Sequence, residues 1–251
     1  NGSEFPALAV ITYDAATDQI LGTMTLAAYQ ALGGHYAELP VPNMVEISPS
    51  GRRVVYHLGR CWDDGTGGNR PLDIGTVFDG PHAWDLDFTD PVKVSVDETH
   101  SGWGWDTAGN ELFVSQNNVN DWIEAVDVMT GQVLQLYYHG ALGWGNGWHF
   151  ARMPPAARGW VLLSTYHDGG QTDWGDNQLF MLELKDHAAG PRVWRLGHTH
   201  NVYAEGDYYA EAFAPIAQTA DRLWWGAKWP GQQTYEAYEM ALPPAWWADL
   251  G

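Results

Sequence analysis

One cycle of four short strands recurs along this 251-residue chain, and the recurrence limits the folds that the chain can adopt. The strands are runs rich in Val, Leu, Ile and aromatic residues, separated by turns rich in Gly, Pro, Asp and Asn. Units begin about 45 to 60 residues apart, which is within or above the blade lengths of propellers. The cycle predicts an all-β fold, a β-propeller of four-stranded antiparallel blades. A β-sandwich is the structural alternative, but a sandwich gives no reason for one strand order to recur.

The strands fall into four classes by their position in the unit. First strands, which would line the centre of a propeller, are predicted at Asn43 to Ser48, Ser101 to Asp106, Trp148 to Met153 and Tyr209 to Ala214. Second strands are predicted at Arg53 to Leu58, Glu111 to Gln116, Trp160 to Tyr166 and Leu223 to Lys228. Third strands are predicted at His82 to Phe88, Trp122 to Val128, Gln178 to Leu184 and Thr234 to Leu242. Fourth strands are predicted at Val92 to Asp97, Gln132 to Tyr138 and Pro191 to Thr199.

The two ends of the chain carry incomplete units. Leu8 to Asp14 and Gln19 to Leu26 are typical of third and fourth strands whose first two are absent, and the last unit has no fourth strand. The chain is therefore either a closed ring of about five blades or a fragment of a larger propeller. Residues 1–5 contain Gly-Ser-Glu-Phe, typical of a cloning remnant. This leaves one predicted propeller domain at 6–251.

Charge excludes one large class of partner. The chain has 12 Lys and Arg against 31 Asp and Glu, a formal net charge of −19. Nucleic acid is excluded as a partner because its phosphates must be neutralised by basic side chains. The chain has no run of about 18 apolar residues, so the sequence predicts no transmembrane segment. We expect an extracellular or periplasmic protein, although no signal peptide is visible; the sequence does not fix its oligomeric state.

Histidines and aromatic residues recur at one phase of the cycle. Loops that join consecutive units emerge on the same face of a propeller as the loops between second and third strands. This phase predicts that one face carries His100, His149, His167, His198 and His200. Amphipathic rings near a polar pocket can stack on sugars and donate hydrogen bonds. We therefore predict ligand-binding roles for Trp103, Trp105, Trp148, Trp174, Trp229, Tyr209, Glu211 and His100.

Acid–base and metal chemistry are predicted on the same face. Imidazole suits proton abstraction near neutral pH, and guanidinium offsets a carboxylate. The candidate catalytic residues are His149, His167, Tyr166 and Arg195. His198 and His200 are candidate ligands of a transition metal, and the Asp-rich loop at 168–177 offers oxygen ligands to Ca²⁺. The same patterns are also explained without a metal, by hydrogen-bonded surface histidines and by Asp and Gly that form turns. A divalent cation is therefore the one candidate cofactor, and the sequence does not establish it.

The C-terminal part of the chain, from Trp160 to Leu250, resembles uncharacterised bacterial propeller proteins. The resemblance is carried by Trp160-Val161-Leu162-Leu163-Ser164-Thr165-Tyr166, Asp176-Asn177-Gln178-Leu179-Phe180, Pro191-Arg192-Val193-Trp194-Arg195-Leu196 and Ala210-Glu211-Ala212-Phe213-Ala214. More distantly, the chain is similar to TolB-like propellers and to propeller polysaccharide lyases that cleave uronate-containing glycans. The metal-dependent lyases have a His-x-His pair where this chain has Glu211-Ala212-Phe213, so the resemblance does not extend to their metal site.

Three functions remain open from the sequence. The first is a binding protein whose His, Trp and Tyr face holds a glycan. The second is a lyase-like enzyme that cleaves uronate-containing glycans by β-elimination, and the third is a structural or assembly propeller. Fold likeness alone does not decide among them.

Overall fold

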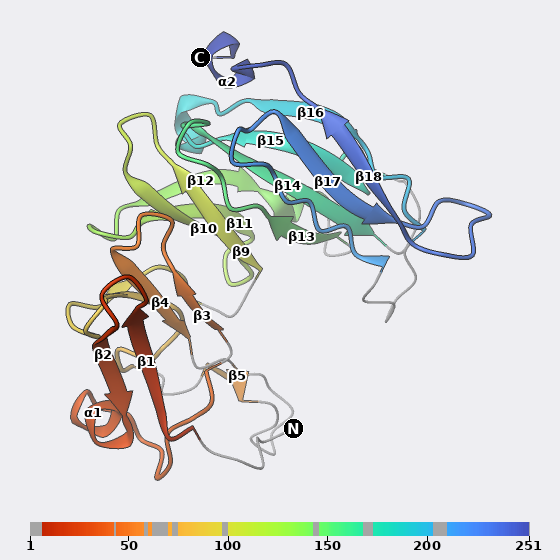
Figure 1. Ribbon diagram of the computed structural model, residues 1–251. Coiled ribbons are helices and arrows are strands. Elements are labelled where there is room, and N and C mark those ends of the chain that lie inside the picture. Colours follow the sequence, from red (N-terminus) through yellow and green to blue (C-terminus); the bar gives the residue numbers. More distant parts are fainter. Residues whose placement is uncertain are drawn as a thin grey trace. The chain divides into compact units, whose positions relative to one another are not determined.

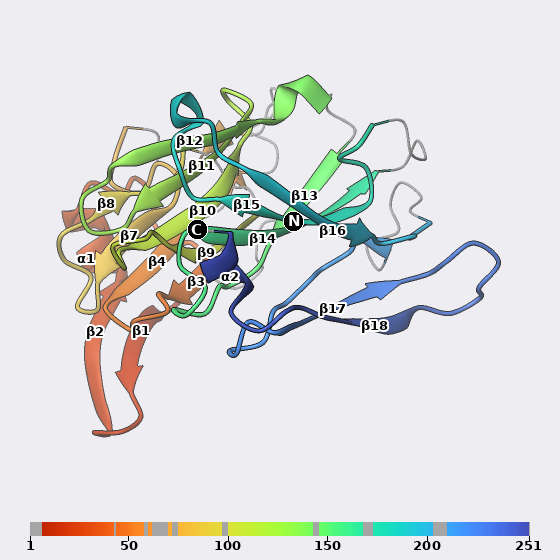
Figure 2. The ribbon, with the colours of Figure 1, turned by 90° about the horizontal axis from the view of Figure 1, so that it is seen from above.

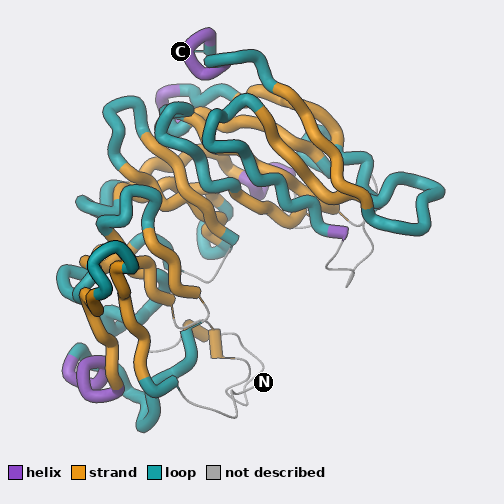
Figure 3. The backbone as a smooth tube through the Cα atoms, in the orientation of Figure 1, coloured by secondary structure: helices purple, strands orange, loops and turns teal. Residues whose placement is uncertain are grey.

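The computed structural model shows an all-β chain in which strands dominate and helices are short (Figures 1 and 3). It describes residues 7–42, 44–57, 60–61, 70–71, 75–96, 100–142, 146–167, 173–202 and 210–250. Within these ranges, no helix has the length and apolar character that crossing a membrane requires. The predicted cloning remnant at 1–5 lies outside the described residues.

The chain divides into two compact units. The first comprises Asn1–Glu98 with Val128–Gln132, and the second comprises Thr99–Asp127 with Val133–Gly251. Each unit has its own hydrophobic core. One domain over 6–251 stays a prediction, as does closure of a ring.

The second unit contains two four-stranded antiparallel sheets, a two-stranded hairpin and a short C-terminal helix (Figures 1 and 2). One sheet has the order β12-β11-β10-β9, formed by β9 (Ser101–Trp105), β10 (Glu111–Asn117), β11 (Trp122–Asp127) and β12 (Val133–Tyr138). The next has the order β13-β14-β15-β16, formed by β13 (Asn146–Phe150), β14 (Trp160–His167), β15 (Gln178–Glu183) and β16 (Val193–His198). The hairpin and helix are β17 (Arg222–Ala227), β18 (Glu236–Ala241) and α2 (Trp246–Asp249).

The first unit holds one more four-stranded antiparallel sheet. Its order is β3-β4-β7-β8, formed by β3 (Met44–Ile47), β4 (Arg53–His57), β7 (His82–Asp85) and β8 (Val92–Lys93). The remaining elements are β1 (Ala9–Asp14), β2 (Gln19–Thr25), α1 (Leu26–Ala31), β5 (Arg60–Cys61) and β6 (Arg70–Pro71). The hydroxyl of Thr25 accepts from the N–H of Ala28, which caps α1 and ends β2.

These sheets confirm the predicted fold class, a propeller-type architecture of four-stranded antiparallel blades. Three of the four predicted first strands form, as β3, β9 and β13. The predicted strand at 209–214 is wrong in its described part, because residues 210–214 contain no strand. Pairing with β17 begins only at the Ile216–Leu223 bridge, next to Pro215, which lacks a backbone N–H.

Burial explains why the strand classes differ in sequence. The strands in the middle of the sheets, such as β10, β14 and β15, are almost wholly buried along their length, as expected for strands covered on both faces. The outer strand β12 is instead mostly exposed or half-buried and buries only Leu136. Continuous apolar runs such as Val161 to Leu163 therefore mark the inside of the unit.

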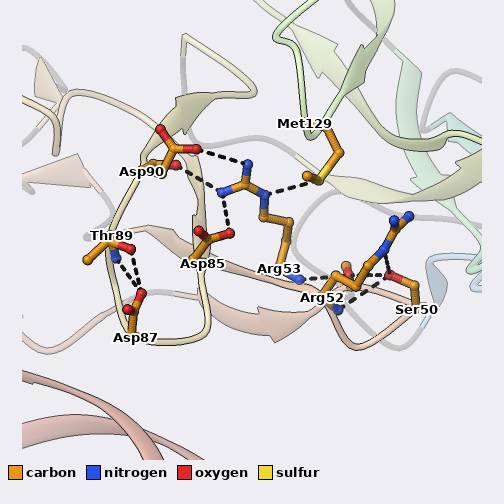
Figure 4. A network of polar contacts seen from close by, with 9 residues as sticks. Ser50, Arg52, Arg53, Asp85, Asp87, Thr89, Asp90 and Met129 are labelled. Carbon is orange, nitrogen blue, oxygen red and sulfur yellow. Dashed lines mark hydrogen bonds and ion pairs between the residues drawn. The ribbon is translucent and has the colours of Figure 1, made fainter.

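A buried guanidinium ties together part of the first unit (Figure 4). Arg53 is 1% exposed, and its Nη1 lies 2.9 Å from an Asp85 carboxylate oxygen and donates to the Asp90 carbonyl at 2.9 Å. Its Nε donates to the sulfur of Met129 at 3.3 Å. A buried charge is tolerated only with partners of this kind.

Candidate functional site

Three side chains from the starts of consecutive structural repeats meet in the second unit. His100 immediately precedes β9, His149 lies in β13, and Glu211 belongs to the segment before β17. One metal-ligand atom of each lies within 4.8 Å of the other two. His149 Nε2 is 2.9 Å from Glu211 Oε2, and the His100 and His149 rings stack with centroids 4.2 Å apart. Within the described ranges, this His100–His149–Glu211 cluster is the one group of three such ligands.

Close approach of two backbone segments brings His100 to His149. β9 lies beside the residues that follow β13, and the N–H of Trp103 donates to the carbonyl of Ala151 at 3.2 Å. A Cβ at Gly102 would lie only 2.6 Å from that carbonyl oxygen, closer than real Cβ contacts allow. The absence of a side chain at Gly102 is therefore a condition for the cluster.

The hydrogen bond of His100 fixes its tautomer. Nδ1 lies 2.8 Å from the carbonyl oxygen of Trp148. A carbonyl can only accept, so Nδ1 carries the proton and donates it. In the neutral ring the lone pair then lies on Nε2, the nitrogen that can bind a metal or accept from a ligand.

His149 and Glu211 form a mostly buried pair whose side chains are 7% and 10% exposed. Burial lowers the pKa of His149 to about 3, and the nearby His100 contributes in the same direction. Burial also raises the pKa of Glu211, while a hydrogen bond from Tyr166 opposes that shift. Both shifts disfavour charge, so His149 is neutral at neutral pH and the pair is held by a hydrogen bond.

Aromatic rings surround the pair. The Phe213 ring stacks on His149 with centroids 3.7 Å apart, and the Tyr166 ring lies 5.2 Å from it at an angle of 26°. A Cβ at Gly147 would lie 1.9 Å from the Tyr166 ring, so this ring packs directly on the glycine. Phe213 is 43% exposed and presents an apolar surface beside the polar pair.

A second aromatic group lies at the end of β17. The rings of Trp229 and Tyr238 are parallel within 3° with centroids 4.7 Å apart, and His200 lies 4.9 Å from Trp229. The side-chain oxygen of Gln232 accepts from the backbone N–H of Trp229 and from the Tyr238 hydroxyl, which ties the Tyr238 ring to the Trp229 backbone. Trp229 is 37% exposed. We call Trp229, Tyr238 and His200 the aromatic ladder.

The candidate metal ligands His198 and His200 lie close together. Their ring centroids are 4.9 Å apart, and the backbone N–H of His200 donates to Nδ1 of His198 at 2.9 Å. Nδ1 is therefore an acceptor, and the neutral ring carries its proton on Nε2. That Nε2 is buried without a hydrogen-bond partner among the described residues.

The other candidate residues are dispersed. Trp103, Trp105 and Trp148 are at most 7% exposed and pack in the interior. Half-buried Trp174 packs against Phe180, and the Arg195 guanidinium lies 5.7 Å over its ring and donates to Gln178. His167 pairs with Asn146 across β14 and β13, at the end of the sheet where β13 begins. Tyr209 lies outside the described residues.

Two kinds of residue were missed from the sequence. Phe213 was considered only as a departure from a metal-binding motif, whereas its ring stacks on His149. Gly102 and Gly147 were not assigned roles, although both make room for the cluster. Their signal was present, because a glycine inside a strand marks close approach of another group.

Comparison with known proteins finds similar structures at low sequence identity. No family model matches the chain, and no curated protein matches it. TolB from Acinetobacter baumannii gives a TM-score of 0.47 at 12% identity, over 94% of this chain and 47% of TolB. An auxiliary nutrient binding protein from Bacteroides ovatus gives 0.39 at 10% identity, over 93% and 57%. The Swd1 β-propeller domain from Myceliophteria thermophila gives 0.40 at 10% identity, over 82% and 58%.

The chain spans about half the length of each of these three proteins, with 47%, 57% and 58% of their chains covered. The expected likeness to TolB-like propellers is confirmed, whereas likeness to polysaccharide lyases stays a prediction. At such low identity the likeness carries no statement about ligand or activity.

Proposed function

We propose that this protein is a ligand-binding propeller and that its ligand is a glycan held at the His100–His149–Glu211 cluster. The observation that carries the proposal is the combination of a mostly buried His149–Glu211 hydrogen bond with the exposed ring of Phe213. Binding sites commonly combine a few fixed polar groups with apolar or aromatic walls.

The chemistry of the site suits a saccharide. A pyranose has apolar C–H faces and a rim of hydroxyl groups. Its faces can stack on aromatic rings such as Phe213, while its hydroxyls exchange hydrogen bonds with imidazole, carboxyl and phenol groups. The aromatic ladder gives a second exposed ring, Trp229, in the same unit.

The side chain of Asn201 links the segments that carry the two groups. The side-chain amide of Asn201, next to His200, donates to the carbonyl of Ala210, next to Glu211. The side-chain oxygen of Asn201 accepts from the N–H of Lys228, next to Trp229, at 2.8 Å. A single buried amide therefore holds the segments of the ladder and of the cluster against each other, as an extended ligand would require.

Charge favours neutral over acidic glycans. A net charge of −19 repels polyanions at long range, with an effect that weakens as salt is added. We propose a location outside the cytoplasm, where polysaccharides are encountered; separation of cell fractions with an antibody to this chain tests it.

A second candidate function is β-elimination on a uronate glycan. It is favoured by the neutral imidazole of His149 beside the phenol of Tyr166, since both are groups that can transfer protons. Arg195 would have to neutralise the carboxylate, but its guanidinium lies over Trp174. β-Elimination on a uronate would therefore require another cation beside the cluster, whereas binding of a neutral glycan requires no cation to offset a carboxylate.

The experiment is a saccharide screen followed by titration calorimetry. Neutral and uronate-containing oligosaccharides are tested against the chain, against Phe213→Ala, and against the matched control Tyr13→Ala, which removes a 53% exposed ring of the first unit. We expect a neutral oligosaccharide to bind, Phe213→Ala to weaken it by about tenfold or more, and the control to leave it unchanged. An unsaturated product that absorbs in the ultraviolet, through its C=C bond conjugated with the carboxylate, would establish the lyase instead. No binding across the screen would refute the proposal.

A further inference from the structure

We propose that His100, His149 and Glu211 bind one divalent transition-metal ion, of which Zn²⁺ is the reference. The inference goes beyond a glycan site, and it rests on the proposed function in one respect, that an oxygen of the ligand completes the coordination. The metal site itself depends on three side chains of the second unit.

The donor set selects the class of metal. Two imidazole nitrogens and one carboxylate oxygen are ligands of Zn²⁺ and of neighbouring transition metals, whereas Ca²⁺ and Mg²⁺ prefer oxygen alone. Two histidines with a glutamate form a three-ligand set that leaves one tetrahedral position open. Such sites bind a water or a substrate oxygen at the fourth position.

The spacing of the ligand atoms is close to what a metal requires. Bonds of about 2.0 to 2.2 Å place neighbouring tetrahedral ligands roughly 3.4 Å apart. The three atoms lie within 4.8 Å of one another, with Nε2 of His149 and Oε2 of Glu211 at 2.9 Å. A separation of 4.8 Å exceeds the tetrahedral one by about 1.4 Å, so binding of an ion would draw the side-chain ends together by that amount at most.

Groups behind the ligands are arranged as metal sites require. A metal-binding histidine usually donates its other N–H to a backbone carbonyl or carboxylate, which orients the ring. His100 does this through Nδ1 to the Trp148 carbonyl at 2.8 Å, which puts the lone pair of the neutral ring on Nε2. The Tyr166 hydroxyl donates to Glu211 and so orients the carboxylate. These two contacts would hold the His100 ring and the Glu211 carboxylate in the orientation that metal binding needs.

The alternative pair, His198 and His200, is less suited. Nδ1 of His198 already accepts from the backbone N–H of His200. No third histidine, cysteine or acidic ligand joins the two among the residues with described positions. A two-ligand pair is weaker than three convergent ligands, so the cluster takes the metal first.

The experiment uses chelator-treated protein without any saccharide. ZnCl₂ is added by titration calorimetry and CoCl₂ by visible absorption, and zinc-edge absorption spectroscopy counts the imidazole ligands. We expect one equivalent of zinc and two imidazoles. His100→Gln, His149→Gln and Glu211→Gln should each weaken binding by about tenfold or more, and Tyr166→Phe by about tenfold. His187→Gln and the His198→Gln/His200→Gln double variant are matched controls that should bind zinc normally.

The outcomes separate this inference from the proposed function. Zinc binding that is lost in the His198→Gln/His200→Gln variant, or the absence of binding, overturns the inference. The wild-type spectrum decides even where a variant fails to fold, since fewer than two imidazoles also overturns it. Saccharide titrations run with EDTA and with zinc then test the link. Zinc binding without saccharide binding refutes only the proposed function, and equal saccharide binding in EDTA refutes completion of the coordination by the ligand.

Discussion

Replacing Gly147 by alanine should damage the site, although the same change in an open strand position should not. The new Cβ would lie 1.9 Å from Cζ of Tyr166 and 2.3 Å from its hydroxyl oxygen, so the ring must leave its position over the strand. Because the Tyr166 hydroxyl donates to Glu211, displacement of the ring also releases that carboxylate. Gly226, in β17, is the control, since a Cβ there meets nothing within 4 Å.

The magnitude follows from two opposing effects. Glycine to alanine within a strand ordinarily stabilises by about 0.5–1 kcal/mol, because the unfolded chain loses freedom. Overpacking at a filled position costs about 1–3 kcal/mol. Gly147→Ala should therefore lower the free energy of unfolding by about 1 kcal/mol and by no more than about 2.5 kcal/mol, from the difference of these effects. Gly226→Ala should leave it unchanged or raise it.

Urea unfolding followed by tryptophan fluorescence measures both variants, and the Gly147→Ala/Tyr166→Ala double variant completes a cycle. If the clash with Tyr166 is the cause, Gly147→Ala should destabilise the wild-type chain but not the Tyr166→Ala variant. The two costs should differ by a coupling energy of about 0.5–3 kcal/mol. Equal effects at Gly147 and Gly226, or no coupling with Tyr166, would refute the reasoning.

Three further predictions concern other parts of the fold. Gly102→Ala should weaken zinc binding by about tenfold in calorimetry. The new Cβ would lie 2.6 Å from the Ala151 carbonyl oxygen and would push β9 away from the segment that follows β13. Unchanged zinc affinity would contradict this. In the Arg53 network, Asp85→Asn with Asp90→Asn should cost about 3–5 kcal/mol of unfolding free energy by leaving a buried charge. Arg53→Met should cost less, because the two carboxylates are 47% and 75% exposed and can be solvated. The reverse order in urea melts would count against it. Burial lowers the pKa of His82 below its ordinary value of 6.5. Below that pH the unfolded chain takes up the proton first, so stability should fall as pH drops from about 6.5 toward the folded pKa. His82→Asn should flatten this part of a stability profile, and an unaltered slope would exclude His82 as the cause.

The position of each strand within its repeat could be predicted because the hydrophobic pattern changes in the same order in every repeat. This pattern placed His100 just before one predicted first strand and His149 and Glu211 inside two others, and the structure brings these three together. The phase does not tell which residues become partners, because partners depend on how closely two backbones approach. That distance is set by Gly102, whose role appears only once β9 lies beside residue 151.

Burial was harder to predict than position. Tryptophans flanked by glycine have the same sequence signal whether they face a ligand or a neighbouring sheet. Trp103 and Trp148 are 2% and 1% exposed, whereas Trp229 is 37% exposed. The difference arises from packing between sheets, which a single sequence does not encode locally. The segment at 210–214 illustrates the same limit, since its apolar pattern resembles a strand but it pairs with no strand in the part of the chain that the structure describes.

A crystal structure of the chain soaked in ZnCl₂, with diffraction recorded at the zinc edge, tests the central claim most directly. We predict one anomalous peak about 2.0–2.2 Å from His100 Nε2, His149 Nε2 and a Glu211 carboxylate oxygen, with the Tyr166 ring over Gly147. A peak at His198 and His200, or His100 and His149 too far apart to share one ion, would contradict the account.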